Sequence, residues 1–196
     1  MAQRPIKNVT SLIVMGGSSG SLEVFFVILG MLNKDFNIPI IFVLHRNSDV
    51  NESLVGILSI KTNLIVKEAD EKELISKGHV YLAPPDYHLL IEKDGSLSLD
   101  ASAKIKYSRP SIDVTFYSAA DAYKEKLTGI ILSGASADGA EGIAYIKQHG
   151  GIAIVQAPEQ ALFAFMPQQA IAQTKVDGIF SSSEIAVFLN NLRDIS

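Results

Sequence analysis

The sequence predicts a three-layer α/β/α protein with a mostly parallel, doubly wound sheet of about seven strands and an inserted β-hairpin. Two observations lead to this fold class. Short apolar runs without polar alternation recur along the chain, as expected for strands that are buried on both faces. Longer segments with apolar residues at helical spacing separate these runs, and such alternation is typical of parallel sheets covered by helices. The length of 196 residues fits a single domain over residues 1–196.

The predicted strands are short apolar runs bounded by turn residues or by helical segments. The first run ends at Gly16-Gly17, and the fourth ends at Pro84-Pro85, which breaks the chain. A hairpin is predicted where Lys93-Asp94-Gly95 separates two runs, because Asp-Gly favours tight β-turns. In chain order the strands are 12–15, 38–44, 64–66, 80–83, the hairpin strands 88–92 and 96–99, 127–132 and 152–155.

The predicted helices have apolar residues that recur at helical spacing, which gives each helix a buried face. One of them ends at Gly150-Gly151, since glycine commonly terminates helices. Ser181 and Glu184 provide a capping start for the last helix. In chain order the helices are 21–32, 52–60, 111–126, 140–149, 166–174 and 182–192, and residues 101–110 are predicted to form a long surface loop.

The composition excludes several classes of function. The chain has no cysteine, which rules out disulfides, a cysteine nucleophile and thiolate metal sites. The formal net charge of −4 argues against a nucleic-acid partner, because binding phosphates needs a basic surface. No apolar run is long enough for a signal-peptide core or a membrane span, and no His, Asp and Glu residues have metal-ligand spacing. We therefore expect a cytoplasmic protein that is not embedded in a membrane and needs no metal or other cofactor.

Three chemically distinct side chains follow three of the predicted strands. Ser18 follows the first strand, His45 the second, and Asp138 the strand at 127–132. In an open parallel sheet the carboxyl ends of the strands share one edge, where ligands bind. A hydroxyl, an imidazole and a carboxylate at that edge are the groups of a nucleophilic triad. We predict that Ser18 is the nucleophile, that His45 is the base, and that Asp138 accepts the Nδ1–H of His45.

Ser18 lies in a glycine-rich loop, Gly16-Gly17-Ser18-Ser19-Gly20-Ser21, which contains the G-x-S-x-G pattern between a strand and a helix. Glycine allows a tight turn at the nucleophile, and N–H groups at the start of the next helix can stabilise an oxyanion. The alternative is a phosphate- or nucleotide-binding loop. Against it, the loop has no P-loop lysine and no G-x-G-x-x-G, and the second strand ends in His45 rather than an acidic residue.

The other histidines, and a second role for Asp138, leave alternatives open. His149 lies at a predicted helix C-terminus and His79 begins a strand, so both are expected to be structural. His88 follows a proline-rich turn, where it either lines a cleft or simply occupies the hairpin. Asp138 precedes Gly139, so its carboxylate is also a candidate cap for the next helix, a role compatible with a bond to histidine.

Six motifs together make the sequence resemble the catalytic domain of the chemotaxis methylesterases, the CheB family, from about Ser11 to about Phe180. They resemble the family's G-A-S-T-G-G nucleophile loop, its histidine strand, and its V-Y-[IL]-A-P, R-P-S-V-D-V, G-M-G-x-D-G and Q…M-P-x-x-A patterns. In this chain the matching segments are residues 16–21, Val43-Leu44-His45, residues 80–84 with His88, residues 109–114, residues 134–139, and Gln156 with Met166-Pro167 and Ala170.

The resemblance implies that Ser18, His45 and Asp138 form the family's catalytic triad. It implies hydrolysis of γ-glutamyl methyl esters on the cytoplasmic part of chemoreceptors, with release of methanol; some members also deamidate receptor glutamines. The backbone N–H of residue 19 is a natural oxyanion donor in this comparison. The positions assigned to the oxyanion hole and the pocket are Ser19, Gly20, Ala135 and Met166.

The sequence departs from the family's pattern near the site, and four of the departures bear on the loop and the pocket. Gly17 stands where the family has alanine, and Ser21 stands where it has glycine. Ala135 replaces a methionine, and Arg46 replaces an apolar residue. Arg46 is expected either to attract an acidic receptor surface or to be an ordinary solvated arginine. These changes leave the chemistry intact and bear on substrate choice.

The expected partners are methylated cytoplasmic domains of chemoreceptors, together with a separate response regulator or another signalling protein. Only residues 1–11 precede the first predicted strand, so the receiver domain usual at the N-terminus of the family is not expected in this chain. Two alternatives to an esterase remain on the same fold: a nucleotide- or phosphate-binding domain, and a non-catalytic domain that binds receptors.

Overall fold

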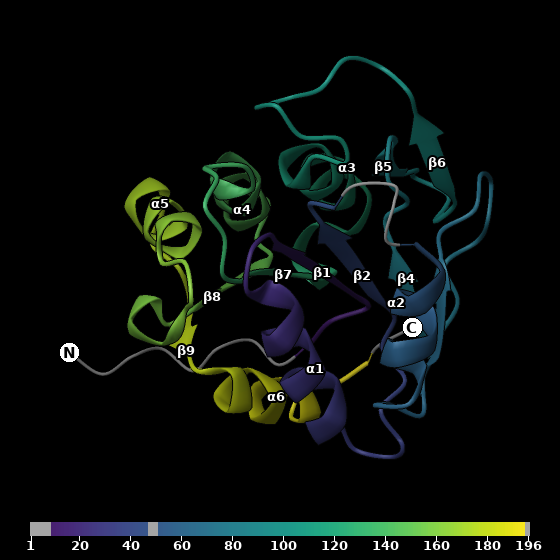
Figure 1. Ribbon diagram of the computed structural model, residues 1–196, viewed down its shortest axis with the longest axis horizontal. Helices are drawn as coiled ribbons and strands as arrows, with labels where there is room; N and C mark the ends of the chain where they lie inside the picture. Colours follow the sequence, from purple (N-terminus) through teal and green to yellow (C-terminus); the bar gives the residue numbers. More distant parts are fainter. Residues whose placement is uncertain (1–8, 47–50, 195–196) are drawn as a thin grey trace.

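The computed structural model describes residues 9–46 and 51–194, and within these residues seven strands form one parallel sheet (Figure 1). The strand order is β3-β4-β2-β1-β7-β8-β9, and all paired neighbours run parallel. This confirms the predicted doubly wound sheet. Its strands are β1 (Leu12–Gly17), β2 (Ile40–Leu44), β3 (Ile65–Glu68), β4 (His79–Leu82), β7 (Leu127–Ile131), β8 (Ile152–Gln156) and β9 (Gly178–Phe180).

Helices cover both faces of the sheet, which confirms the three-layer prediction (Figure 1). One face carries α3 (Ile112–Tyr123), α4 (Ala140–Gln148) and α5 (Phe165–Gln173). The other face carries α1 (Ser21–Met31), α2 (Asn51–Ser59) and α6 (Ser182–Asn190). Short 3-10 turns occur at η2 (Lys124–Lys126) and η3 (Pro158–Gln160).

The side chains of β1 show why the strands lack polar alternation. Leu12 and Val14 join the core beneath α3, α4 and α5, whereas Ile13 and Met15 join the core beneath α1, α2 and α6. All four side chains are fully buried. Burial of each stabilises the fold by about 1.5–3 kcal/mol, so a central strand with helices on both sides is apolar at every position.

The predicted hairpin is present as β5 (His88–Ile91) and β6 (Leu97–Asp100), an antiparallel pair outside the main sheet. Leu89, Ile91 and Leu97 are buried in the core beneath α3. The predicted capping start of α6 is also confirmed, since the Ser181 hydroxyl accepts from the Glu184 N–H at 3.2 Å.

The structure differs from the prediction at two elements. The edge strand β9 was not predicted because it has only three residues, and Ile179 at its centre is 46% exposed. The predicted helix over 111–126 ends at Tyr123, because Lys124 has a φ of 50°, outside the helical region. Neither difference affects the carboxyl edge of the central strands, where the catalytic residues were predicted.

Candidate active site

The loops that follow β1, β2 and β7 meet at the carboxyl edge of the sheet. β1 and β2 pair in register up to Gly17 and Leu44, so Ser18 and His45 each follow this pair by one residue. The His45 N–H donates to the Gly17 carbonyl at 3.2 Å, and neighbouring strands lie about 4.8 Å apart, so the backbones of Ser18 and His45 are adjacent. On the other side of β1, the Ser18 N–H donates to the Ser133 carbonyl at 3.0 Å, which brings in the loop after β7.

The His45 imidazole is hydrogen bonded to the Asp138 carboxylate, with 2.8 Å between Nε2 and Oδ2. Asp138 is fully buried, and the His45 side chain is 13% exposed. The prediction that Nδ1 faces the carboxylate is wrong, because the ring presents Nε2 to it. The structure thus joins two of the three predicted triad side chains, which are 93 positions apart in the sequence.

Asp138 is bound by the start of α3 and not by the helix that follows it. Oδ1 accepts from the Ser111 hydroxyl at 2.8 Å and from the Asp113 N–H at 3.1 Å, and Oδ2 accepts from the Ile112 N–H at 2.7 Å. The predicted cap of the next helix is wrong, since the N-cap of α4 is Gly139 and no side chain caps it. The partial positive charge at a helix N-terminus favours a carboxylate in this position.

The pKa of Asp138 reflects two opposed effects. Burial raises the pKa, but the hydrogen bonds from His45 and from the N–H groups of Ile112 and Asp113 outweigh burial and leave it below the ordinary value. Asp138 is therefore ionised at neutral pH. Because an ionised carboxylate only accepts hydrogen bonds, neutral His45 carries its proton on Nε2 and has its lone pair on Nδ1.

The loop that carries Ser18 is fixed by Gly20 and Ser21. Gly20 is the N-cap of α1 and has a φ of 79°, a conformation that glycine adopts at little cost. The Ser18 carbonyl accepts from the Ser21 N–H at 3.0 Å and from the Ser21 hydroxyl at 2.6 Å. Across the described part of the chain, the backbone N–H groups of Ser19 and Gly20 donate to no protein acceptor. They are therefore available to a bound oxyanion.

Gly17 and Ser21 fit each other closely, and both are departures from the family's loop pattern. A Cβ atom on Gly17 would lie 2.4 Å from the Ser21 Cβ and 2.5 Å from its Oγ, which is far inside van der Waals contact. The Ser21 side chain thus occupies the space that a side chain at position 17 would need. The glycine at position 17 therefore leaves the space that the serine at position 21 fills.

Gly134 is a site position to which the sequence analysis assigned no role of its own. A Cβ on Gly134 would lie 2.6 Å from the Met166 Cε and 3.1 Å from the Ser18 Cβ, so the residue separates the methionine from the nucleophile loop. Met166 is fully buried and supports this loop from within, whereas Ala135 is exposed. The signal for Gly134 was its place at the start of the matched 134–139 motif.

His88 supports Asp138 through Ser111 and does not line a cleft. His88 is fully buried; its Nδ1 accepts from the Ser111 N–H at 3.1 Å, and its Nε2 lies 3.1 Å from the Ala103 carbonyl. The Ser111 hydroxyl in turn donates to Asp138. The matched 109–114 segment contained Ser111, but nothing in the sequence indicated that it would reach a carboxylate 27 positions away.

Arg46 lies inside the protein, so both sequence interpretations of it were wrong. Its side chain is only 6% exposed and forms an ion pair with Glu68. Its Nη2 also lies 3.4 Å from the Ala83 carbonyl. The guanidinium therefore ties the end of β2 to neighbouring strands. His79 and His149 each bond a nearby backbone carbonyl through Nδ1, at 2.8 and 2.9 Å, as expected of structural histidines.

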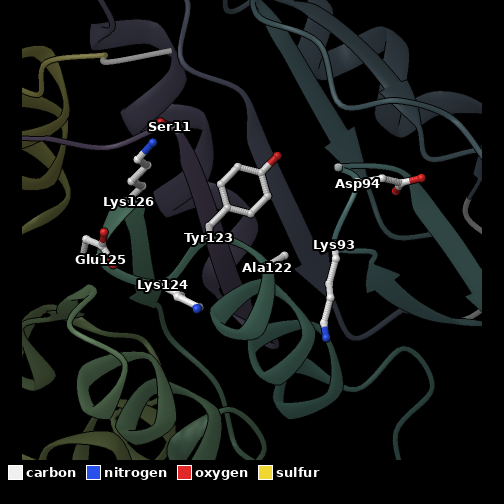
Figure 2. Close-up of a pocket in the computed structure, with 9 residues that line it drawn as sticks. Ser11, Lys93, Asp94, Ala122, Tyr123, Lys124, Glu125 and Lys126 are labelled. Atoms are coloured by element: carbon white, nitrogen blue, oxygen red, sulfur yellow. The ribbon is translucent and has the colours of Figure 1, made fainter.

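A separate pocket lies at the opposite, amino edge of the sheet, where β1 and β7 begin. Its volume is about 510 Å³, and Figure 2 shows Tyr123 between lysines that come from the hairpin and from η2. None of the predicted triad residues lines it. The lining residues are Ser11, Lys93, Asp94, Gly95, Ala122, Tyr123, Lys124, Glu125 and Lys126.

Among residues 9–46 and 51–194, no group of three or more His, Cys, Asp or Glu side chains is arranged to hold a metal ion. In the same ranges, no helix has the length and apolar character needed to traverse a lipid bilayer.

The fold and this edge of the sheet define a class of protein: a three-layer α/β protein in which a buried carboxylate orients a histidine beside a serine-bearing glycine loop, as in serine hydrolases. The family model described as CheB methylesterase matches residues 13–189. The chain belongs to the CheB methylesterase family, which confirms the resemblance seen in the sequence.

Individual relatives agree with this membership. A Leptospira interrogans protein, provisionally named protein-glutamate methylesterase/protein-glutamine glutaminase, is 46% identical over 174 residues, which cover 89% of this chain and 90% of the relative. A Thermotoga maritima protein-glutamate methylesterase/protein-glutamine glutaminase is 34% identical over 177 residues, or 89% of this chain and 52% of the relative. FrzG of Myxococcus xanthus, a protein-glutamate methylesterase, is 32% identical over 184 residues, or 94% of this chain and 55% of the relative. This chain thus spans about half the length of the last two proteins.

A solved structure has the same fold. The crystal structure of the Thermotoga maritima CheB methylesterase catalytic domain matches with a TM-score of 0.87 and 33% identity. The match covers 92% of this chain and 97% of that domain.

Proposed function

We propose that the protein is a protein-glutamate methylesterase that hydrolyses γ-glutamyl methyl esters on chemoreceptors through a Ser18 acyl-enzyme. The single observation that carries the proposal is the 2.8 Å bond between His45 and buried Asp138, at the strand end adjacent to Ser18. Family membership supports the reaction class, and the names of the relatives support a protein glutamate as the group acted on. The chemoreceptor as substrate is what the sequence resemblance to the family implies.

In the proposed first half-reaction, His45 takes the Ser18 hydroxyl proton on Nδ1 while the Ser18 oxygen attacks the ester carbonyl. Asp138 remains ionised and stabilises the imidazolium through Nε2. The N–H groups of Ser19 and Gly20 hold the oxyanion, each donor contributing about 3 kcal/mol to transition-state stabilisation. The imidazolium then gives its proton to the departing methoxide, and methanol leaves.

In the second half-reaction, His45 takes a proton from water, which attacks the acyl-Ser18 carbonyl. The tetrahedral intermediate collapses, Ser18 regains its proton from the imidazolium, and the receptor carries a free glutamate. Deamidation of a receptor glutamine follows the same route with ammonia as the leaving group. Several relatives bear both activities in their names, and this supports a second substrate.

The test is hydrolysis of a methylated chemoreceptor cytoplasmic fragment, followed as released methanol. Ser18→Ala should abolish turnover and change the free energy of unfolding by less than about 1 kcal/mol, because a partly exposed hydroxyl contributes little packing. Ser19→Ala is the matched control: the neighbouring hydroxyl is exposed, its proposed role resides in the backbone N–H, and activity should be retained.

A serine-directed fluorophosphonate provides a second readout. We expect the adduct on Ser18, mapped by mass spectrometry, in the wild type and in the Ser19→Ala variant. Methanol release by the Ser18→Ala variant at the wild-type rate, or an adduct on another serine, would remove Ser18 as the nucleophile. Phosphate or nucleotide binding without any esterase activity would favour the alternative binding domain.

A further inference from the structure

A tight turn at residues 105–108 brings the Ser108 side chain beside His45. The Ile105 and Ser108 backbones exchange two hydrogen bonds, of 3.1 and 2.8 Å. The residues between them, Lys106 and Tyr107, both have positive φ, at 47° and 66°. This is the geometry of a type I′ turn, which ordinarily takes asparagine and glycine. Non-glycine residues in this region cost free energy, and such strain concentrates at functional sites.

The turn is held against the active site from two sides. The Ser108 hydroxyl lies 3.3 Å from His45 Nδ1, the nitrogen that does not face Asp138. The Lys106 ammonium binds buried Asp113 at 2.7 Å and Glu141 at 2.9 Å. The charge of Lys106 is therefore satisfied within the protein, and the side chain left for a ligand is that of Tyr107.

Tyr107 is 97% exposed, although it is the neighbour of a residue that contacts His45. An aromatic ring in full contact with water gives no stability to the folded chain, and the backbone beneath it is strained. Aromatic side chains in this situation are typical of binding hot spots, because they offer a large contact area and lose little conformational entropy.

A second exposed apolar group borders the loop that carries Ser18. Leu162 is 73% exposed, and a Cβ on Gly20 would lie 2.7 Å from its Cβ, so Leu162 borders the nucleophile loop. Phe163 is 43% exposed, and its backbone is held by hydrogen bonds with Ser133 and Gly134. Ser108, the neighbour of Tyr107, contacts His45 at the end of β2, whereas Leu162 lies in the segment after β8. In the sheet, β2 and β8 lie on opposite sides of β1, the strand that leads to Ser18.

We propose that Tyr107 and Leu162 form an apolar clamp that binds the polypeptide segment on either side of the reacting glutamyl ester. The inference rests on the proposed function and specifies how a protein substrate is distinguished from a small ester. The occupant is a segment of the substrate protein with apolar side chains flanking the modified glutamate. A polypeptide that delivers its side chain to Ser18 continues on both sides of the modified glutamate, whereas a small ester has no such extensions to contact Tyr107 and Leu162.

The test compares Tyr107→Ala and Leu162→Ala with the wild type on a methylated chemoreceptor fragment. We expect KM to rise about tenfold in each variant with kcat within twofold, because a hot-spot contact removed from ground state and transition state alike weakens binding only. The second-order rate of fluorophosphonate labelling at Ser18 should stay within twofold, since that reagent does not span the clamp. Ile60→Ala is the control: Ile60 is 78% exposed, it follows α2 at the amino edge, and its removal should change neither KM nor labelling.

An unchanged KM in both variants overturns the clamp. A labelling rate that falls in parallel with kcat/KM also overturns it, because it would indicate a distorted active site. Failure of the proposed function has a different signature: the wild type would neither release methanol nor label at Ser18. Affinity for the receptor fragment, titrated in the Ser18→Ala background without turnover, then still tests the clamp. A tenfold weaker Kd on adding Tyr107→Ala supports it, and an unchanged Kd refutes it.

Discussion

Replacement of Asp138 by asparagine should damage both the reaction and the fold, which distinguishes this residue from Ser18. The two carboxylate oxygens accept from the Ser111 hydroxyl, the Ile112 and Asp113 N–H groups, and His45 Nε2. In Asp138→Asn one oxygen becomes an NH2 group, so the backbone N–H of either Ile112 or Asp113 loses its acceptor, and the other group on that oxygen, His45 or the Ser111 hydroxyl, must accept a hydrogen bond instead of donating one. A buried donor left without a partner costs about 1–3 kcal/mol, so we expect a loss of this size in the free energy of unfolding.

Urea denaturation measures this loss, and methanol release measures the reaction. We expect kcat to fall by about 10⁴, the effect known for loss of the orienting carboxylate in a serine protease triad. Ser111→Ala is the control: it removes one donor, leaves Asp138 three partners, and should cost only about 1 kcal/mol. If Asp138→Asn unfolds at the wild-type urea concentration, the role assigned to the α3 contacts is wrong, whatever happens to kcat.

The pH dependence of the stability difference between the wild type and Asp138→Asn provides a second check on the role of the carboxylate. Since the folded-state pKa of Asp138 is lowered, its carboxylate contributes stability above the unfolded-state pKa of about 3.9, and this contribution disappears as pH falls through the folded-state pKa. The stability gap between the wild type and Asp138→Asn should therefore narrow as the pH falls below about pH 4. A gap that failed to narrow there would contradict the assigned direction of the shift.

Two glycines of the site give further predictions. Gly134→Ala places a Cβ 2.6 Å from the Met166 Cε and 3.1 Å from the Ser18 Cβ. We expect the displaced nucleophile to lower kcat/KM by about 10²-fold, measured by methanol release. A loss below twofold would show that the loop adapts freely. Gly17→Ala meets Ser21 at 2.4 Å and should destabilise by about 1–3 kcal/mol, whereas the double variant Gly17→Ala/Ser21→Gly should recover most of that stability in urea. If the stability losses of the two single variants simply add in the double variant, the packing between positions 17 and 21 is refuted.

The sheet could be predicted from the sequence because full burial leaves a clear pattern. Strands such as β1, covered on both faces, require an uninterrupted apolar run. The strand β9 has three residues at the sheet edge, and this is too short for any periodicity to be seen. The convergence of His45 and Asp138 was predictable for a similar reason, since parallel strands must end at one edge.

The finer geometry of the site depends on contacts that no local pattern encodes. His45 presents Nε2 rather than Nδ1, and Asp138 bonds the start of α3 rather than α4. The contacts of Asp138 follow from how closely α3 approaches the loop after β7, which is a property of packing between distant segments. Arg46 was misread for the same reason, because its partner Glu68 lies on β3, separated from it by 22 positions.

The interlocked fit of Gly17 and Ser21 restricts the order in which relatives can exchange these residues. A lineage that moves from this loop to the family pattern, with alanine at the first position and glycine at the second, passes through one of two single intermediates. The intermediate made by Gly17→Ala alone contains an overlap of atoms directly behind the nucleophile, while the one made by Ser21→Gly alone contains only a small void. The Ser21→Gly intermediate costs less stability than the Gly17→Ala intermediate. Sequences on the evolutionary path between the two loops should therefore carry glycine at both positions.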